Sequence, residues 1–178
     1  MPKEYATAET FRRATANQLQ PILNVLSSIE WPCPATHIPL IIERLGWVHT
    51  RDLVGVEANT RLPLNRATGN FSQPDGQFTR LGFPVSDYVS EDDPAALQTV
   101  SDDFPIAVRD MESILGPRSF DEYGEHKGAA WDLESGGRIR LDCIDIGLQA
   151  RLLSRDLADA ERFEETHDMS EFYDDEDE

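Results

Sequence analysis

The side chains best suited to chemistry in this sequence are carboxylates, which occur in adjacent groups. Acid–base catalysis needs one such carboxyl in an apolar pocket, where burial raises its pKa. These groups instead lie among polar residues, where carboxylates cap helices or face solvent. They are Glu91-Asp92-Asp93, Asp102-Asp103, Asp121-Glu122 and Glu164-Glu165. The sequence therefore predicts no catalytic residue. Asp142 and Asp145, where the alternation of an expected strand shifts, are the two carboxylates whose burial would suggest a catalytic role.

Histidine and cysteine are too scattered to predict a metal centre. Glu164 and His167 have the E-x-x-H spacing that places two ligands on one helix face, but a di-metal bundle needs two such motifs. Cys33 and Cys143 are far apart in sequence and are interpreted as small buried hydrophobic residues. Neither a glycine-rich phosphate loop nor a G-x-S-x-G motif occurs, so we expect no metal and no cofactor.

The net charge of −18 constrains the kind of partner. Residues 156–178 hold 12 of the 34 acidic residues and one arginine, so this segment contributes −11 and the rest −7. Such a charge repels nucleic acid and anionic membranes and attracts basic proteins. Solubility alone is the alternative explanation.

Residues 129–153 have the strongest strand pattern. Apolar and polar residues alternate on both sides of Gly136-Gly137, which predicts a β-hairpin with a two-residue turn. At Cys143-Ile144 the alternation changes phase, so a bulge or turn is expected near residues 142–145. The result is a three-stranded meander with one apolar face. Arg138 and Arg140 lie on its polar face, with Asp132 and Glu134 predicted opposite them across the hairpin.

Four helices are expected around this sheet. Apolar residues at helical spacing predict helices over residues 17–30, 36–45, 93–115 and 154–165. Pro105 predicts a kink or break in the third. The apolar residues expected on the fourth are Leu157, Ala160 and Phe163.

The remaining sequence predicts two more strands and two loops. Residues 52–58 and 77–89 have strand character, and Pro84 favours an edge position for the second. Residues 59–76, rich in Asn, Pro and Gly, and the polar residues 118–128 are predicted to be loops.

Short connections between strands favour an α+β fold, an antiparallel sheet (meander) covered by helices. We expect one domain over residues 1–165 and a disordered acidic C-terminal tail over residues 166–178. No apolar run has the length of a membrane span or signal region, so the chain is expected to be cytoplasmic.

Several packing and capping motifs carry a family resemblance. They are Trp31-Pro32, HIPLIIERLGW at 37–47, Asp103-Phe104, Leu115-Gly116-Pro117 and Trp131-x-Leu133 before the glycine hairpin. In these the chain resembles a family of small actinobacterial proteins that are themselves similar to immunity proteins of polymorphic toxins. An example is the immunity factor for the mycobacterial NAD-hydrolysing necrotising toxin.

The resemblance implies a non-enzymatic protein that covers the active site of a cognate basic-cleft toxin, of nuclease or NAD-glycohydrolase type. The first candidates for partner binding are Asp121, Glu122, Tyr123 and Glu125, where an aromatic anchor lies among acids. A solvated linker is the alternative for this segment. For the whole chain, the alternatives are an acidic adaptor or chaperone for a secretion system and an enzyme with an unrecognised site.

Overall fold

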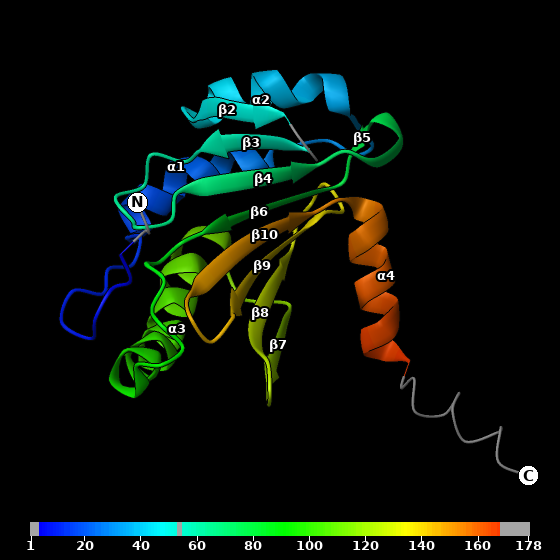
Figure 1. Ribbon diagram of the computed structural model, residues 1–178. Helices are drawn as coiled ribbons and strands as arrows, with labels where there is room; N and C mark the ends of the chain where they lie inside the picture. Colours follow the sequence, from blue (N-terminus) through cyan, green and yellow to red (C-terminus); the bar gives the residue numbers. More distant parts are fainter. Residues whose placement is uncertain (1–3, 53–54, 168–178) are drawn as a thin grey trace, which may run out of the picture.

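The computed structural model describes residues 4–52 and 55–167 and confirms an α+β fold with an antiparallel sheet (Figure 1). Its helices are α1 (Ala16–Ser27), α2 (Ile38–Leu45), α3 (Pro94–Leu115) and α4 (Arg155–Thr166). Its strands are β1 (Cys33–Pro34), β2 (Val48–Asp52), β3 (Val56–Asn59), β4 (Thr68–Ser72), β5 (Gln77–Phe78), β6 (Arg80–Pro84), β7 (Phe120–Tyr123), β8 (Lys127–Asp132), β9 (Arg138–Cys143) and β10 (Leu148–Leu153). The expected tail beyond residue 167 lies outside the described residues.

Eight strands form one sheet in the order β2-β3-β4-β6-β10-β9-β8-β7, and β1 pairs separately with β5. Successive side chains of a strand point to opposite faces, which gives this sheet two different surfaces. One face is apolar and packs against α1 and α3, which lie behind the sheet in Figure 1. Its buried side chains include Phe71, Leu81, Phe83, Trp131, Ile139, Leu141, Ala150 and Leu152.

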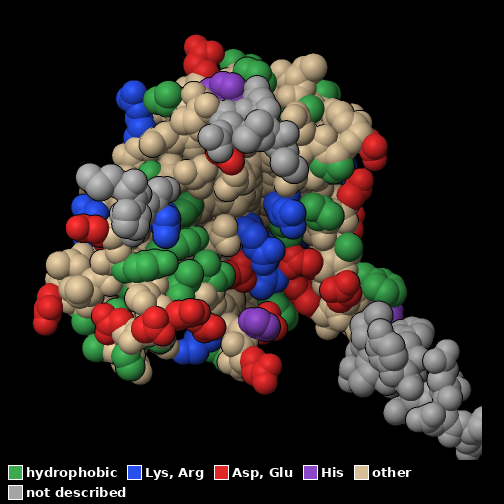
Figure 2. Space-filling model, viewed as in Figure 1, with side chains coloured by type: hydrophobic (Ala, Val, Ile, Leu, Met, Phe, Trp, Pro, Cys, Tyr) green, Lys and Arg blue, Asp and Glu red, His purple; other side chains and the backbone are tan. Residues whose placement is uncertain are grey.

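The opposite face is polar at its centre. Arg140 of β9 pairs in register with Arg151 of β10, and Arg151 pairs with Gly82 of β6. Figure 2 shows lysine and arginine side chains at the middle of this face, with acidic side chains between them and α4.

The first two helices follow their apolar patterns but begin differently from the prediction. α1 begins at Ala16, because Thr15 and Gln18 form a reciprocal capping box. A 3-10 turn over Ala35–His37 precedes α2, which ends at Gly46 with a left-handed φ of 72°, as its sequence predicts.

α3 is one continuous helix of 22 residues with Pro105 inside it, so of the two predicted alternatives, a kink or a break, the break is wrong. Pro105 is exposed, and on that outer side water can replace the hydrogen bond that proline removes. The predicted apolar stripe packs on the core, with Phe104 and Met111 buried. The helix thus forms a rigid support for the sheet end next to β7.

Both predicted loops contain strands. Residues 59–76 include β4, whose Gly69 accommodates the Trp47 ring; a Cβ atom there would lie 2.7 Å from that ring. Residues 118–128 include β7 and the start of β8. The prediction of loops was wrong because these segments have a polar composition. They form strands through pairing with a neighbouring strand, not through an intrinsic β preference.

Two further strand predictions need correction. The strand expected over residues 52–58 is divided, with β2 ending at Asp52 and β3 beginning at Val56. Gly55, at a positive φ of 129°, lies before β3. β6 is an interior strand rather than an edge; Pro84 is its last residue, where a missing N–H disrupts the ladder least.

The meander of β8, β9 and β10 is confirmed. Its first turn is longer than predicted, because the ladder ends at the Asp132–Arg138 pair and Leu133 N–H donates to Gly137 O at 3.0 Å. The predicted phase change is a turn between the paired residues Cys143 and Leu148. It projects from the sheet end near α3.

α4 packs on the polar face of the meander through charges. Arg138, only 1% exposed, binds Asp132 at 2.8 Å and forms two hydrogen bonds to Glu165. Arg140 binds Glu161 at 2.5 Å. The predicted apolar residues face outward instead, with Leu157 and Phe163 exposed and Ala158 the buried residue of this helix. The fourth helix is confirmed, but its orientation is set by ion pairs.

Asp132 makes the attachment of α4 sensitive to acid. Burial alone would raise the pKa of Asp132, but hydrogen bonds from Arg138 and Arg162 outweigh burial and hold the pKa below its ordinary value. A depressed pKa stabilises the fold above the unfolded-state pKa of about 4, and this contribution is lost as pH falls through the folded-state pKa.

We therefore expect Asp132→Asn to reduce the free energy of unfolding most at neutral pH. The difference from wild type should shrink steadily below about pH 4. Urea unfolding at neutral and acidic pH measures the free energy of unfolding of both proteins. A difference that stays constant over this range would contradict the role assigned to the Asp132 carboxylate.

Candidate protein-binding site

β7 is the last strand of the eight-stranded sheet, and in the described part of the chain it pairs with β8 alone. An edge strand presents backbone N–H and C=O groups that another chain can pair with. Asp121 and Glu122 are exposed on this strand. Charges at an edge oppose self-association while leaving the edge open to a partner of opposite charge.

The predicted binding residues alternate between the two sides of β7. Glu122 lies on the polar face, 3.6 Å from Arg140. Asp121 lies on the other side and pairs with Arg118 at 3.2 Å. Tyr123, 65% exposed, ends the strand and is the most exposed large aromatic side chain among the described residues. These three residues therefore share a strand but do not form one patch.

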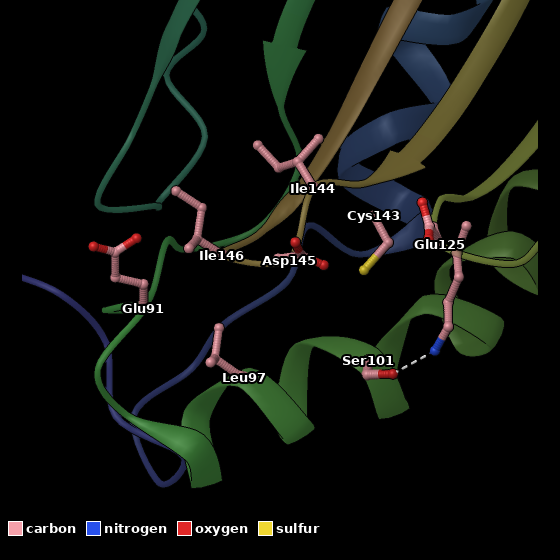
Figure 3. Close-up of a pocket in the computed structure, with 9 residues that line it drawn as sticks. Glu91, Leu97, Ser101, Glu125, Cys143, Ile144, Asp145 and Ile146 are labelled. Carbon is pink, nitrogen blue, oxygen red and sulfur yellow. Dashed lines mark hydrogen bonds between the residues drawn. The ribbon is translucent and has the colours of Figure 1, made fainter.

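Glu125, in the turn between β7 and β8, lies in a hollow at the end of the sheet (Figure 3). We call this hollow, of about 510 Å³, the acidic hollow. Its lining residues are Glu91, Leu97, Ser101, Glu125, Lys127, Cys143, Ile144, Asp145 and Ile146. They come from the segment before α3, the helix itself, the β7–β8 turn, the start of β8, the end of β9 and the β9–β10 turn.

The acidic hollow combines an apolar floor with a charged rim. Leu97 of α3 packs against the core and, with Ile146, lies between the two ends of the hollow in Figure 3. Glu91 and Glu125 mark those ends. Asp145 adds a third exposed carboxylate between them.

The β9–β10 turn positions Asp145 and Ile144. Asp145 has a left-handed φ of 66°, which aspartate tolerates better than most residues. The turn closes when Ile144 N–H donates to Gly147 O at 2.9 Å. Ile144 lines both this hollow and the one beside it, and its side chain remains 37% exposed.

Among the residues that the structure describes, Lys127 is the one basic residue that lines the acidic hollow. Its ammonium group donates to Ser101 Oγ at 2.6 Å, which ties β8 to α3. Three rim carboxylates against one ammonium leave the hollow with a local negative charge. Such a site favours a cationic group with an apolar stem, as in arginine or lysine.

A second hollow of about 540 Å³ lies on the other side of the β9–β10 turn. Glu122 and His126 line it together with Arg140, Asp142 and Arg151. Asp142 accepts contacts from Arg140 at 3.0 Å and Arg151 at 2.9 Å. These pairs neutralise one another, so this hollow carries less unpaired negative charge than its neighbour.

The cysteines lack the properties of catalytic nucleophiles. Burial raises the pKa of the Cys143 thiol, and it raises the pKa of Cys33 as well. Protonated thiols are weak nucleophiles. Within residues 4–52 and 55–167, no group of three or more His, Cys, Asp or Glu residues is arranged to hold a metal ion.

The carboxylates singled out at the phase change have separate roles. Asp142 belongs to the arginine pairs described above, whereas Asp145 is exposed on the rim. The sequence did not predict Glu91, Ile144 or Ile146 as site residues. Ile144 and Ile146, two apolar residues inside a turn, were a sequence signal for this site, because exposed apolar residues mark contact surfaces.

Comparison with known proteins gives one family. The model of a family of unknown function, DUF6301, matches residues 17–154. No curated protein and no solved structure matches the chain. In the described residues, every helix is too short or too polar to cross a membrane.

Proposed function

We propose that this chain, a member of the DUF6301 family, is a non-enzymatic inhibitor that binds a cognate toxin and covers its cationic active-site cleft. In this proposal it is an immunity protein, and it acts in the cytoplasm. The observation that carries the proposal is the acidic hollow, one end of which is formed by Glu125 of the β7–β8 turn.

The acidic hollow suits a basic side chain in two ways. Its apolar floor, which includes Leu97 and Ile146, matches the aliphatic stem of lysine or arginine. Its rim carboxylates, Glu91, Glu125 and Asp145, match the charged head group. A toxin that acts on nucleic acid or NAD needs cationic residues around phosphate groups, and those residues are natural ligands for this surface.

β7 offers a second contact next to the acidic hollow. A partner segment could extend the sheet by pairing with its backbone, a common mode of protein recognition. Tyr123 would then lie near the centre of the contact, where aromatic side chains contribute most binding energy. The two contacts are continuous, since the β7–β8 turn links them.

The overall charge assists encounter. With a net charge of −18, the chain attracts a basic partner over a distance comparable to the Debye length, about 8 Å at physiological salt. Such steering raises association rates towards about 10⁸–10⁹ M⁻¹ s⁻¹ at low salt. Fast association is useful to an inhibitor that must bind before its target acts.

Co-expression with toxins encoded next to this gene tests the proposal. The chain should restore growth of a bacterial host that expresses the cognate toxin, and the two proteins should co-purify. A Tyr123→Ala chain, which lacks the exposed aromatic side chain at the end of β7, should protect less well. Failure to rescue any neighbouring toxin, together with no complex, would contradict the proposal.

The concentration of acids in residues 156–178 favours a second candidate, an adaptor or chaperone that holds a basic client for a secretion system. Removal of residues 168–178 separates the two. An inhibitor that uses the acidic hollow should retain most of its affinity, whereas a chaperone that uses the tail should lose it.

A further inference from the structure

The polar face of β9 holds two arginines in an unusual position for a sheet covered by a helix. Arg138 and Arg140 are 1% and 8% exposed and are separated by one residue, so both point to the same face. Side chains two residues apart on a strand are separated by about 6.7 Å. The pair therefore forms a fixed, desolvated row of two guanidinium groups.

The carboxylates of α4 match this row in spacing. Glu161 and Glu165 are four residues apart on a helix and share one face, separated by about 6 Å along the axis. Glu161 binds Arg140 at 2.5 Å and lies 3.8 Å from Arg138. Glu165 binds Arg138 through both guanidinium Nη atoms. An R-x-R strand thus pairs with an E-x-x-x-E helix.

α4 is otherwise held by polar contacts: Arg162 binds Asp132 at 2.7 Å and donates to Gly136 O at 2.9 Å, and Arg155 donates to Ser135 O at 2.8 Å. Its Leu157 and Phe163 are exposed, and Ala158 is its buried residue. A helix normally docks by burying an apolar stripe. Because ion pairs depend on charge and spacing rather than on a shaped apolar surface, another helix with the same two carboxylates could take the same position.

The family match includes the two arginines but not the helix that pairs with them. It covers residues 17–154, which include Arg138 and Arg140, and it ends one residue before α4 begins at Arg155. The docking face thus lies inside the matched domain, whereas the helix that fills it lies outside.

We propose that the Arg138–Arg140 pair is a recognition site for acidic helices with two carboxylates four residues apart, and that α4 is its exchangeable occupant within the chain. This site is separate from the acidic hollow and binds a ligand of opposite charge. A helix supplied by another protein would compete with α4 for it.

A full-length Glu161→Gln/Glu165→Gln variant tests the proposal. Hydrogen exchange of the α4 amides should become at least tenfold faster, while the β9 amides stay unchanged. The probe is a labelled peptide with the sequence of residues 154–167, cross-linked into a helix between positions 160 and 164 on its outer face. Fluorescence anisotropy measures its binding.

The probe should bind the variant at least tenfold more tightly than it binds the wild-type chain, whose site is filled. A probe with glutamine at both positions should bind at least tenfold more weakly, and adding Arg140→Gln to the variant should reduce binding similarly. Equal binding of the two probes would overturn the proposal. No binding of the wild-type-sequence probe would also overturn it, whether the α4 amides of the variant are protected or free.

Discussion

Replacing Glu91, Glu125 and Asp145 together by lysine is expected to weaken binding to the cognate toxin at least 100-fold. These carboxylates form the rim of the acidic hollow, and the replacement turns attraction for a cationic group into repulsion. Like charges brought together at an interface cost several kcal/mol, and a 100-fold loss corresponds to about 2.7 kcal/mol. Titration calorimetry on the purified pair measures this loss.

A matched variant separates the local effect from the overall charge. Glu30, Glu43 and Glu134 are exposed and do not line the acidic hollow. Their replacement by lysine changes the net charge equally, so it should slow association but leave the dissociation rate nearly unchanged. If both triple variants lose the same affinity, or neither does, the acidic hollow is not the binding site.

The features that could be predicted from sequence are those with strong local periodicity. The phase change at Cys143-Ile144 predicted a turn, and the structure places there the turn that presents Ile144 and Asp145 to the acidic hollow. The left-handed end of α2 is equally local, because it depends on Gly46 directly after the helix. In both cases the determining interactions lie within a few residues of one another.

Segments that depend on distant partners were not predictable. β4 and β7 have the composition of loops, and each becomes a strand because a neighbouring strand pairs with it. The acidic hollow has the same origin, since Glu91 and Glu125 are far apart in sequence and meet only when α3 packs beside the β7–β8 turn. Of the acids predicted to bind a partner, Asp121, Glu122 and Glu125, the last alone lines the acidic hollow.

The orientation of α4 illustrates how charge can override an apolar pattern. Leu157, Ala160 and Phe163 suggest a buried stripe, yet all three side chains are exposed. The sheet face opposite carries Arg138 and Arg140, which would lose Glu165 and Glu161 if the helix turned its apolar side inward. Breaking two buried ion pairs costs about 3–5 kcal/mol each, more than the about 1.5–3 kcal/mol for exposing each of a leucine and a phenylalanine.

Replacing Arg138 by methionine is expected to lower the free energy of unfolding by about 3 kcal/mol. The substitution keeps most of the apolar volume but leaves Asp132, Glu161 and Glu165 close together without their shared cation. Breaking a buried ion pair by removing one partner costs about 3–5 kcal/mol, and the partial exposure of these carboxylates favours the lower end. Urea unfolding followed by circular dichroism measures the change.

Arg162→Met is the matched control for this prediction, because Arg162 also binds Asp132, at 2.7 Å, but is more exposed. Its cost should stay below about 1 kcal/mol, as for other surface ion pairs. In a chain that already carries Glu161→Gln and Glu165→Gln, the cost of Arg138→Met should fall substantially, since the carboxylates left unpaired are then neutral amides. Equal costs for Arg138→Met in both backgrounds would show that Arg138 stabilises the fold independently of α4.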